Sequence, residues 1–257
     1  MLKVTLLGTG TSGGVPALGC ECDVCRSTDP KDKRLRSAAM IETESTRLLI
    51  DAGPDIRQQM LRVPFRKIDG LLITHKHYDH VGGIDDLRPF CKYGDINIYG
   101  DKGVTKSLPV TMPYCFPASS KELYPGAPKL QLHTIEPHHI YKIGDIEWMP
   151  VKVMHDKMPI LGFRFGKFAY ITDMKTIPDE ELPYLKGLEV LVVNALRFEK
   201  PHHSHQLVDD AIRFAIRIGA EKVYFTHMTH DIGLHDAANK RLPKGFQFGY
   251  DGQVIEL

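Results

Sequence analysis

A short run of histidines and an aspartate constrains this chain more than any other feature. Four side chains of metal-binding type fall within six positions of the string ITHKHYDHVGG: His75, His77, Asp79 and His80. The apolar run 71–73 before them predicts a buried strand that ends in a rigid loop. Two histidines one residue apart can hold one metal ion from such a loop, while Asp79 and His80 can hold a second. Adjacent cations activate water and stabilise the charge of a displacement, so the cluster predicts a binuclear metal site.

Three more residues of metal-binding type each follow a strand-like run further along the chain. They are His155 after residues 148–154, Asp173 after 168–172 and His227 after 222–226. Loops at strand ends place functional groups on a rigid scaffold, although any one of these residues alone would be weak support for a site. Together with the first cluster they form a set of seven candidate ligands.

Cysteine usage predicts a separate metal site near the N-terminus. Three of the five cysteines are clustered in GCECDVC, as Cys20, Cys22 and Cys25. An odd count with tight clustering favours metal binding in a reducing compartment over a disulfide framework. Three thiolates leave a tetrahedral structural zinc one ligand short, and a histidine from elsewhere is the expected fourth ligand.

Composition restricts the class of protein. The chain has 257 residues, 42% of them hydrophobic, and a formal net charge of +1. This near-neutral charge predicts no broad surface for nucleic acid or anionic membrane. No run approaches the roughly 18 apolar residues of a membrane span, and MLKVTLLGTGTSGG lacks the features of a signal peptide. We therefore expect a cytoplasmic protein, and the lack of repeats or polar linkers predicts one domain over residues 1–257.

Hydrophobic periodicity predicts strands through the middle of the chain and flanking helices. The expected strands are residues 3–7, 38–42, 47–50, 70–74, 129–135, 140–143, 146–154, 161–165, 168–171, 190–193 and 222–225. The expected helices are residues 55–61, 179–185 and 206–218. Residues 101–128 are rich in Pro, Gly and Ser, which predicts an irregular, variable insertion near the substrate. Such a pattern implies an α/β sandwich.

The order of the seven candidate ligands resembles the metallo-β-lactamase superfamily, whose usual first motif is matched by Asp51-Ala-Gly. The resemblance implies a four-layer αβ/βα sandwich with a binuclear site at one edge of the two sheets. One metal would be held by His75, His77 and His155, and the other by Asp79, His80 and His227. Asp173 would bridge both metals, Asp51 would orient a ligand, and a water or hydroxide between the metals would be the nucleophile.

Two details narrow the resemblance within the superfamily. An aspartate, Asp173, stands where true β-lactamases typically carry cysteine, which favours hydrolases and phosphodiesterases. In addition, THMTH places His230 three residues after His227, which resembles the cyclic phosphodiesterases of the bacterial phosphonate (C–P lyase) operon. In that family the cysteine motif and the second histidine bind a structural zinc. The implied zinc ligands here are Cys20, Cys22, Cys25 and His230.

His205 is the remaining catalytic candidate. An apolar stripe follows it at helical spacing, which predicts Ser204 near the N-cap and His205 in the first turn. A helix N-terminus favours a phosphate, and a histidine there can bind the phosphoryl group or protonate the leaving oxygen. The same position is a catalytic histidine in related phosphodiesterases and in tRNA 3′-processing endonucleases. We therefore predict Asp79 and His205 as catalytic and His205 as substrate-binding, with His202 and His203 as solvated loop residues.

These observations predict a metal-dependent hydrolase, foremost a phosphodiesterase acting on a small phosphodiester, with a cyclic one as a candidate. It would use two divalent ions, zinc or manganese, and one structural zinc. The alternatives are a tRNA 3′-processing endonuclease, a thioesterase or lactonase, and a zinc-dependent scaffold without activity. The neutral charge and the lack of a basic arm disfavour a nucleic-acid substrate. The family resemblance also implies a possible homodimer.

Overall fold

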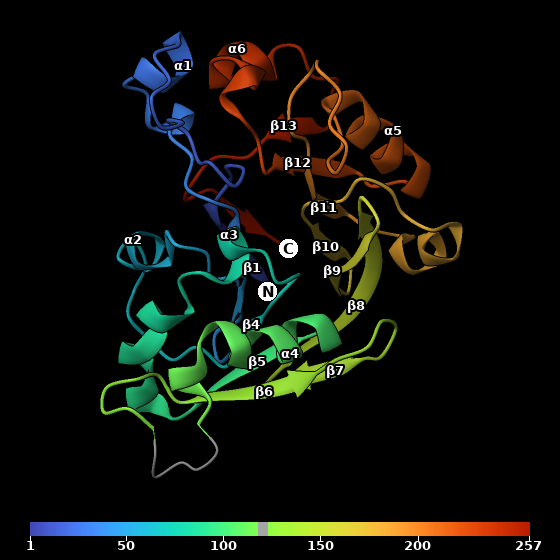
Figure 1. Cartoon of the computed structure of the whole chain (residues 1–257). Helices are drawn as coiled ribbons and strands as arrows, with labels where there is room; N and C mark the ends of the chain where they lie inside the picture. The colour runs from blue at the N-terminus through green and yellow to red at the C-terminus, as the bar shows by residue number, and fades with distance from the viewer. Residues whose placement is uncertain (118–122) are drawn as a thin grey trace.

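The computed structural model describes residues 1–117 and 123–257, and it contains two seven-stranded β-sheets (Figure 1). The first sheet has, in spatial order, β14 (Val254–Glu256), β1 (Lys3–Gly8), β2 (Ala38–Glu42), β3 (Arg47–Ile50), β4 (Gly70–Leu72), β5 (Ile96–Gly100) and β6 (Leu130–Thr134). The second has β13 (Phe246–Phe248), β12 (Lys222–Thr226), β11 (Val190–Asn194), β10 (Phe168–Ile171), β9 (Met158–Phe165), β8 (Ile146–His155) and β7 (Tyr141–Ile143). Both sheets mix parallel and antiparallel pairs.

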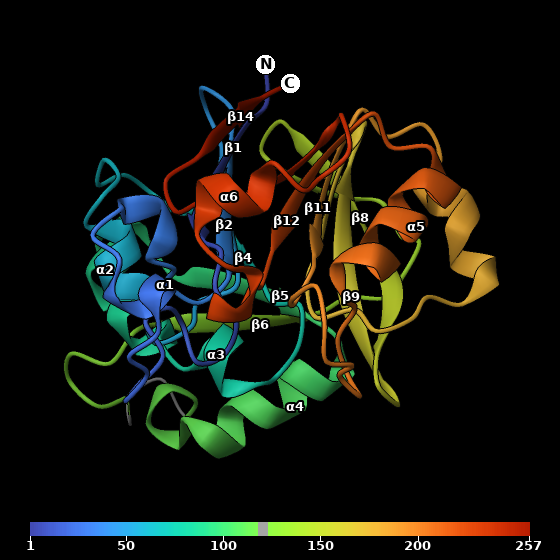
Figure 2. The same cartoon turned by 90° about the horizontal axis from the view of Figure 1, so that it is seen from above.

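Helices cover the outer faces of the two sheets (Figure 2). The first sheet is covered by α2 (Ile56–Met60), α4 (Lys102–Thr111) and the 3-10 helix η2 (Ile84–Tyr93), whose apolar residues share one cluster with the strands. The second sheet is covered in the same way by α5 (Val208–Ile218) and the 3-10 helix η5 (Asp179–Leu185). Three short helices lie near loops, namely α1 (Asp23–Arg26), α3 (Tyr78–Val81) and α6 (His235–Asn239). The predicted four-layer arrangement is therefore confirmed.

The core between the sheets explains why the strands are apolar on both faces. In β2, Ala39 and Ile41 pack in the cluster shared by the two sheets, while Ala38 and Met40 pack toward the helices. All four residues are buried, as expected for a sheet that is covered on both sides. None of the helices among the described residues is long and apolar enough to cross a membrane.

The predicted irregular segment at 101–128 is partly helical, so that prediction was wrong over much of its length. Asp101 caps α4 by accepting a hydrogen bond from the Val104 amide at 2.8 Å, and Val104 and Leu108 are buried. The Gly and Pro content concealed this helix because Pro109 lies inside it. Residues 118–122 of the predicted insertion lie outside the described residues, and its contact with substrate stays a prediction.

The start of α5 also differs from the prediction. The helix begins at Val208 with Leu207 as its N-cap, and not near Ser204. Asp210 accepts a hydrogen bond from the Leu207 amide at 3.2 Å, which satisfies one of the free amides of the first turn. His205 therefore lies in a bend before the helix, and the helix N-terminus does not by itself form its site. Gly219, with a φ of 75°, ends the helix.

Candidate metal centres

The seven candidate ligands gather into two adjacent groups at the ends of strands from both sheets. In each group the ligand atoms lie within 4.8 Å of one another. The first group is His75, His77 and His155, and the second is Asp79, His80, Asp173 and His227. Their grouping matches the two sets that the sequence implied. Asp173 falls in the second group, and it also forms a further group with His155 and His205, so it lies beside both sets. The assignment of each residue as a ligand stays a prediction.

In the first group, hydrogen bonds orient the His155 ring so that its Nε2 atom is free to face a cation. The Nδ1 atom of His155 lies 2.8 Å from the Asp173 carbonyl oxygen and 3.0 Å from that of Ser204. Carbonyl oxygens only accept, so Nδ1 carries the hydrogen and Nε2 keeps its lone pair. The Nε2 atom of His75 lies 3.0 Å from Nδ1 of His77. Burial lowers the pKa of both His75 and His77, which favours the neutral, metal-binding form.

In the second group, two carboxylates and two imidazoles converge. The His80 Nε2 atom lies 3.2 Å from an Asp79 oxygen and 3.3 Å from an Asp173 oxygen. The His227 Nε2 atom lies 3.0 Å from the other Asp173 oxygen. On the far side of the ring, His80 Nδ1 lies 2.7 Å from the buried carboxylate of Asp51. Asp51 thus orients His80 so that Nε2 faces the carboxylates.

The charges in this group depend on one another. Burial alone would raise the pKa of Asp173, but the neighbouring His227 and His80 hold it well below its usual value. Burial alone would lower the pKa of His227, but Asp173 and Asp79 raise it to about 9. Without a cation, protons on the imidazoles balance the buried carboxylates. A divalent ion can supply the same balancing charge.

Buried polar atoms show that a metal ion fits this donor set. Within the described part of the chain, His80 Nε2 and both ring nitrogens of His227 are buried and make no well-aligned hydrogen bond, although carboxylate oxygens lie 3.0–3.3 Å from the two Nε2 atoms. Buried polar atoms almost always have a partner, and each exception needs an explanation. A metal ion bound there would account for the missing hydrogen-bond partner of Nε2 in both histidines. Imidazole and carboxylate donors suit zinc, manganese or iron.

Backbone strain marks the same strand ends. Asp51, Asp173 and His227 adopt φ angles of 61°, 57° and 58°, in the left-handed region that favours glycine. Such conformations cost free energy and cluster at functional sites. Here each one turns the chain directly after a strand, β3, β10 or β12, and so brings the side chain into the cluster.

His205 joins the cluster although it lies outside the helix that was predicted to hold it. Its Nε2 atom is 3.0 Å from Asp173 Oδ1, and its ring stacks on His227 with centroids 4.8 Å apart. Burial lowers the pKa of His205 to about 4. His202, which the sequence was expected to leave in solvent, is half-buried, and its Nδ1 lies 3.0 Å from Nδ1 of His205. The H-x-x-H spacing of His202 and His205 was the one signal for this pair.

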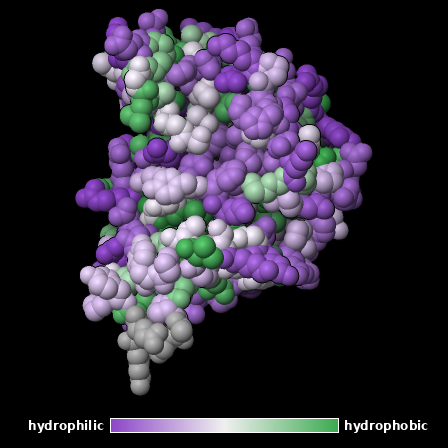
Figure 3. All heavy atoms as spheres, viewed as in Figure 1, coloured by the Kyte–Doolittle hydropathy of each residue, from purple (hydrophilic) through white to green (hydrophobic). Residues whose placement is uncertain are grey.

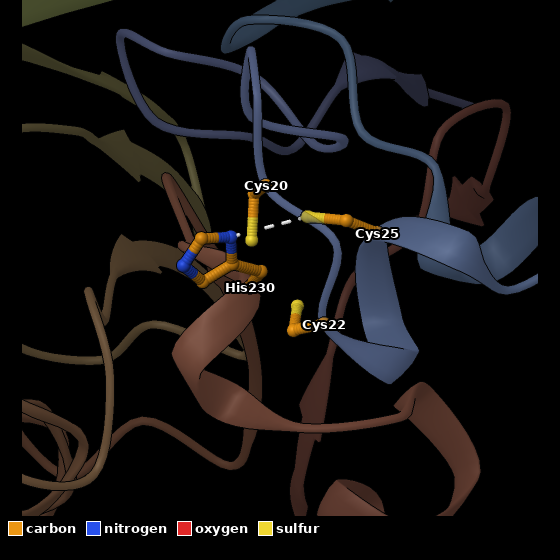
Figure 4. A group of neighbouring side chains, drawn as sticks. All are labelled: Cys20, Cys22, Cys25 and His230. Atoms are coloured by element: carbon orange, nitrogen blue, oxygen red, sulfur yellow. Dashed lines mark hydrogen bonds between the residues drawn. The ribbon is translucent and has the colours of Figure 1, made fainter.

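A third group lies near the N-terminus, where the cysteine loop meets the segment after β12. Figure 4 shows the side chains of Cys20, Cys22, Cys25 and His230 turned toward one another. Cys25 Sγ lies 3.2 Å from His230 Nδ1. Burial raises the pKa of the Cys25 thiol to about 11, so a metal must displace its proton in order to bind. Three sulfurs and one nitrogen match the donor set of a structural zinc.

The comparisons with known proteins identify the family. A family model described as a beta-lactamase superfamily domain matches residues 46–228. The chain belongs to this superfamily. The matched residues include all seven candidate ligands of the first two groups, while the cysteine loop and His230 lie outside them.

Individual superfamily members show closer likenesses. A diphosphatase from the PhnP family is 36% identical, with a TM-score of 0.91, and the match covers 100% of this chain and 98% of that one. This match confirms the resemblance, predicted from the sequence, to the phosphodiesterases of the phosphonate operon. The Zn²⁺-bound PqqB from Methylobacterium extorquens is 18% identical, with a TM-score of 0.77 over 99% of this chain and 100% of that one. It shares the fold.

One curated relative carries a different name. An octanoyltransferase from Porphyromonas gingivalis is 41% identical over 98% of this chain, but the match covers 51% of that protein. The chain thus spans about half the length of that relative. The superfamily fold, the PhnP-family likeness and the three ligand groups together support a metal-dependent hydrolase.

Proposed function

We propose that this protein is a metal-dependent phosphodiesterase that cleaves a small phosphodiester, with cyclic phosphodiesters and diphosphate esters as candidate substrates. The observation that carries the proposal is the position of His205 beside Asp173, with Nε2 3.0 Å from the carboxylate and next to both ligand groups. This nitrogen can donate to a phosphoryl oxygen or to the leaving oxygen. The similarity to a PhnP-family diphosphatase supports phosphoryl chemistry.

Each residue of the site has a role in this proposal. His75, His77 and His155 would hold one divalent ion, and Asp79, His80 and His227 would hold the other. Asp173 lies beside residues of both sets and would serve as a ligand to both ions. When bound, the two ions, zinc or manganese, would supply an activated water and neutralise charge on the phosphoryl oxygens. Asp51 holds the His80 ring in place, and His205 contacts the substrate. The face around α3 is mostly hydrophilic (Figure 3), as suits a charged substrate.

The cysteine loop has a structural role in the proposal. Cys20, Cys22, Cys25 and His230 hold one zinc ion, and His230 is only three residues from His227. A zinc there fastens the N-terminal loop to the segment that carries an active-site ligand. Because the thiols are free, we place the protein in a reducing compartment, the cytoplasm. The proposed partner is a small molecule, and a homodimer remains a proposal.

Acyl hydrolysis is the second candidate function. It is favoured by the 41% identity to a protein named octanoyltransferase, but that name describes a chain about twice as long as the match. The same metal site can direct water to an acyl carbon, as in a thioesterase or lactonase. A tRNA 3′-processing endonuclease is less favoured because the net charge is only +1.

A substrate comparison separates these functions. The purified protein is analysed for bound zinc and manganese and is then assayed on bis(p-nitrophenyl) phosphate and on an octanoyl thioester, with Asp79→Ala as the control. We expect diester cleavage that is lost in the control, because Asp79 is a proposed metal ligand. Thioester cleavage without diester cleavage would move the protein to the acyl hydrolases.

A further inference from the structure

We propose that His202 is a positioning residue for His205, and that with Ser204 it keeps a hydrogen on Nδ1 of His205 so that Nε2 alone faces the reaction. The inference rests on the proposed function, because it assigns a partner to the histidine that contacts the substrate there. His202 lies outside the four groups of metal-binding side chains found among the described residues.

Four short contacts fix the hydrogen positions. The backbone amide of Ser204 lies 3.3 Å from His202 Nδ1, and a backbone N–H only donates, so this ring nitrogen accepts. His205 Nδ1 is 3.0 Å from the same atom and therefore carries the hydrogen between them. The Ser204 hydroxyl lies 3.1 Å from His205 Nδ1 and 3.2 Å from His202 Nδ1. It can accept from His205 Nδ1, which again places the hydrogen on that atom.

The hydrogen on Nδ1 determines what Nε2, on the opposite side of the His205 ring, can do. The Asp173 carboxylate only accepts, so its 3.0 Å contact with His205 Nε2 needs a hydrogen on Nε2 as well, and the ring that donates to a leaving oxygen carries both hydrogens. When Nε2 gives up its proton, the hydrogen held on Nδ1 leaves a neutral ring. Without His202, the Ser204 hydroxyl is free to donate to His205 Nδ1. The ring then has a hydrogen only on Nε2, and a neutral imidazole is a much weaker acid than one that carries both hydrogens.

The backbone of this segment is held independently of His202. The Gln206 amide donates to the Met174 carbonyl at 3.1 Å, and the Leu196 amide donates to the Gln206 carbonyl at 3.0 Å. Lys175 Nζ donates to the His205 carbonyl at 3.2 Å. Replacing the His202 side chain should therefore change the His205 ring and leave the segment in place. This separates positioning from a merely structural role.

Kinetics on bis(p-nitrophenyl) phosphate provide the first test. His202→Leu removes the acceptor, and we expect kcat to fall roughly 10–100-fold, the usual cost of losing a group that orients a functional histidine, with little change in KM. His202→Asn keeps an acceptor near the position of Nδ1 and should restore most of kcat. His203→Leu is the matched control, because His203 is exposed and its ring is tilted against that of His202, with centroids 4.5 Å apart. It should stay within about twofold of the wild type.

Imidazole ¹⁵N NMR of the zinc-loaded protein provides a test that needs no turnover. The His205 signals are assigned by their loss in His205→Gln, and we expect a protonated Nδ1 in the wild type and in His202→Asn, but not in His202→Leu. A bare Nδ1 in the wild type overturns the proposal even if His202→Leu fails to fold. Unchanged kcat and unchanged signals in a folded His202→Leu also overturn it. If the wild type shows the expected signals but cleaves no diester, the proposed function fails and the positioning role stands.

Discussion

At the scale of single residues, the protein orients three of the site histidines, His80, His155 and His205, through the ring nitrogen that faces away from the metal groups. Asp51 binds Nδ1 of His80, two carbonyl oxygens bind Nδ1 of His155, and His202 contacts Nδ1 of His205. Such partners fix the tautomer and the direction of the free nitrogen. The ligands are therefore oriented before any metal binds.

Removing the Asp51 charge should weaken metal binding. We expect Asp51→Asn to lower the affinity for the metal near His80 roughly 10–100-fold, because an amide orients and polarises the ring less well than a carboxylate. Competition with a coloured chelator measures this affinity, and Glu44→Gln, an exposed carboxylate elsewhere, is the control. Equal affinity in Asp51→Asn and wild type would show that Asp51 does not support the ligand.

Removing the His205 ring should separate catalysis from metal content. We expect His205→Ala to lower kcat on bis(p-nitrophenyl) phosphate by roughly 10²–10⁴, the usual contribution of a general acid, while the bound metal stays unchanged. Asp173→Ala should instead lose both turnover and metal. Elemental analysis beside the assay distinguishes the two variants, and loss of metal in His205→Ala would make His205 a ligand.

The sequence allowed the ligand types to be predicted, but not the conformations that bring them together. His155, Asp173 and His227 were found because each follows an apolar run. The left-handed backbone of Asp173 and His227 has no sequence signal, since neither is glycine or asparagine. The partner role of His202 was also missed, because a histidine in a polar loop most often faces solvent.

At the scale of elements, the candidate ligands lie at or just after the ends of strands, and short loops connect the strands. Long apolar runs made the strands predictable, whereas α1, α3 and α6 have only four or five residues each. That is too short for a helical period to be recognised. The strands β5, β13 and β14 were also missed, although β4 and β7 are as short as β13 and β14 and were predicted.

The cysteine loop should hold one metal independently of the active site. We expect Cys25→Ser to reduce bound zinc by one equivalent and to lower the melting temperature, because Cys25 is the buried thiol of the group. Cys91→Ser, which lies outside the group, is the control. Zinc content measured after gel filtration gives the stoichiometry, and an unchanged value in Cys25→Ser would exclude the cysteine loop as a zinc site.

A buried polar network near this loop predicts opposite effects of pH on stability. Arg34 donates to His235 Nδ1 at 3.0 Å and to Thr9 Oγ1 at 2.8 Å, while Asp251 accepts from Thr9. Burial and Arg34 lower the pKa of His235 to about 4. Its contribution to the free energy of unfolding is therefore complete above its unfolded pKa, about 6.5, and is lost as the pH falls through 4. Burial raises the pKa of Asp251 to about 6, so its contribution is complete below its unfolded pKa, about 4, and is lost as pH rises through 6.

Single substitutions should separate the effects of His235 and Asp251 on the pH dependence of stability. We expect the free energy of unfolding of His235→Gln to fall with rising pH between 4 and 6, relative to wild type, because only Asp251 then titrates in the network. Asp251→Asn should show the reverse, rising between pH 4 and 6.5, because only His235 remains. Each effect is at most about 3 kcal/mol. Urea unfolding at several pH values measures both, and parallel curves for the three proteins would contradict the assignment.

At the scale of the whole molecule, the two sheets share one apolar core and meet where the ligand groups form. The antiparallel pairing of β1 with β14 places the first and last strands side by side in the first sheet. The layer arrangement was predictable from the order of strands and ligands. The relation of the cysteine loop to His227 was not, because residues 20–25 and 230 are far apart in sequence and only a family resemblance linked them.

Metal dependence of diester cleavage tests the proposed chemistry most directly. The protein is stripped with a chelator, and hydrolysis of bis(p-nitrophenyl) phosphate is measured as zinc or manganese is added back, in the wild type and in Asp79→Ala. We predict no cleavage by the stripped protein and recovery of cleavage as metal ions bind the ligand groups. We predict no recovery in the variant, because its second group has lost one of its two carboxylates. Cleavage that survives metal removal, or equal recovery in Asp79→Ala, would contradict a phosphodiesterase built on these residues.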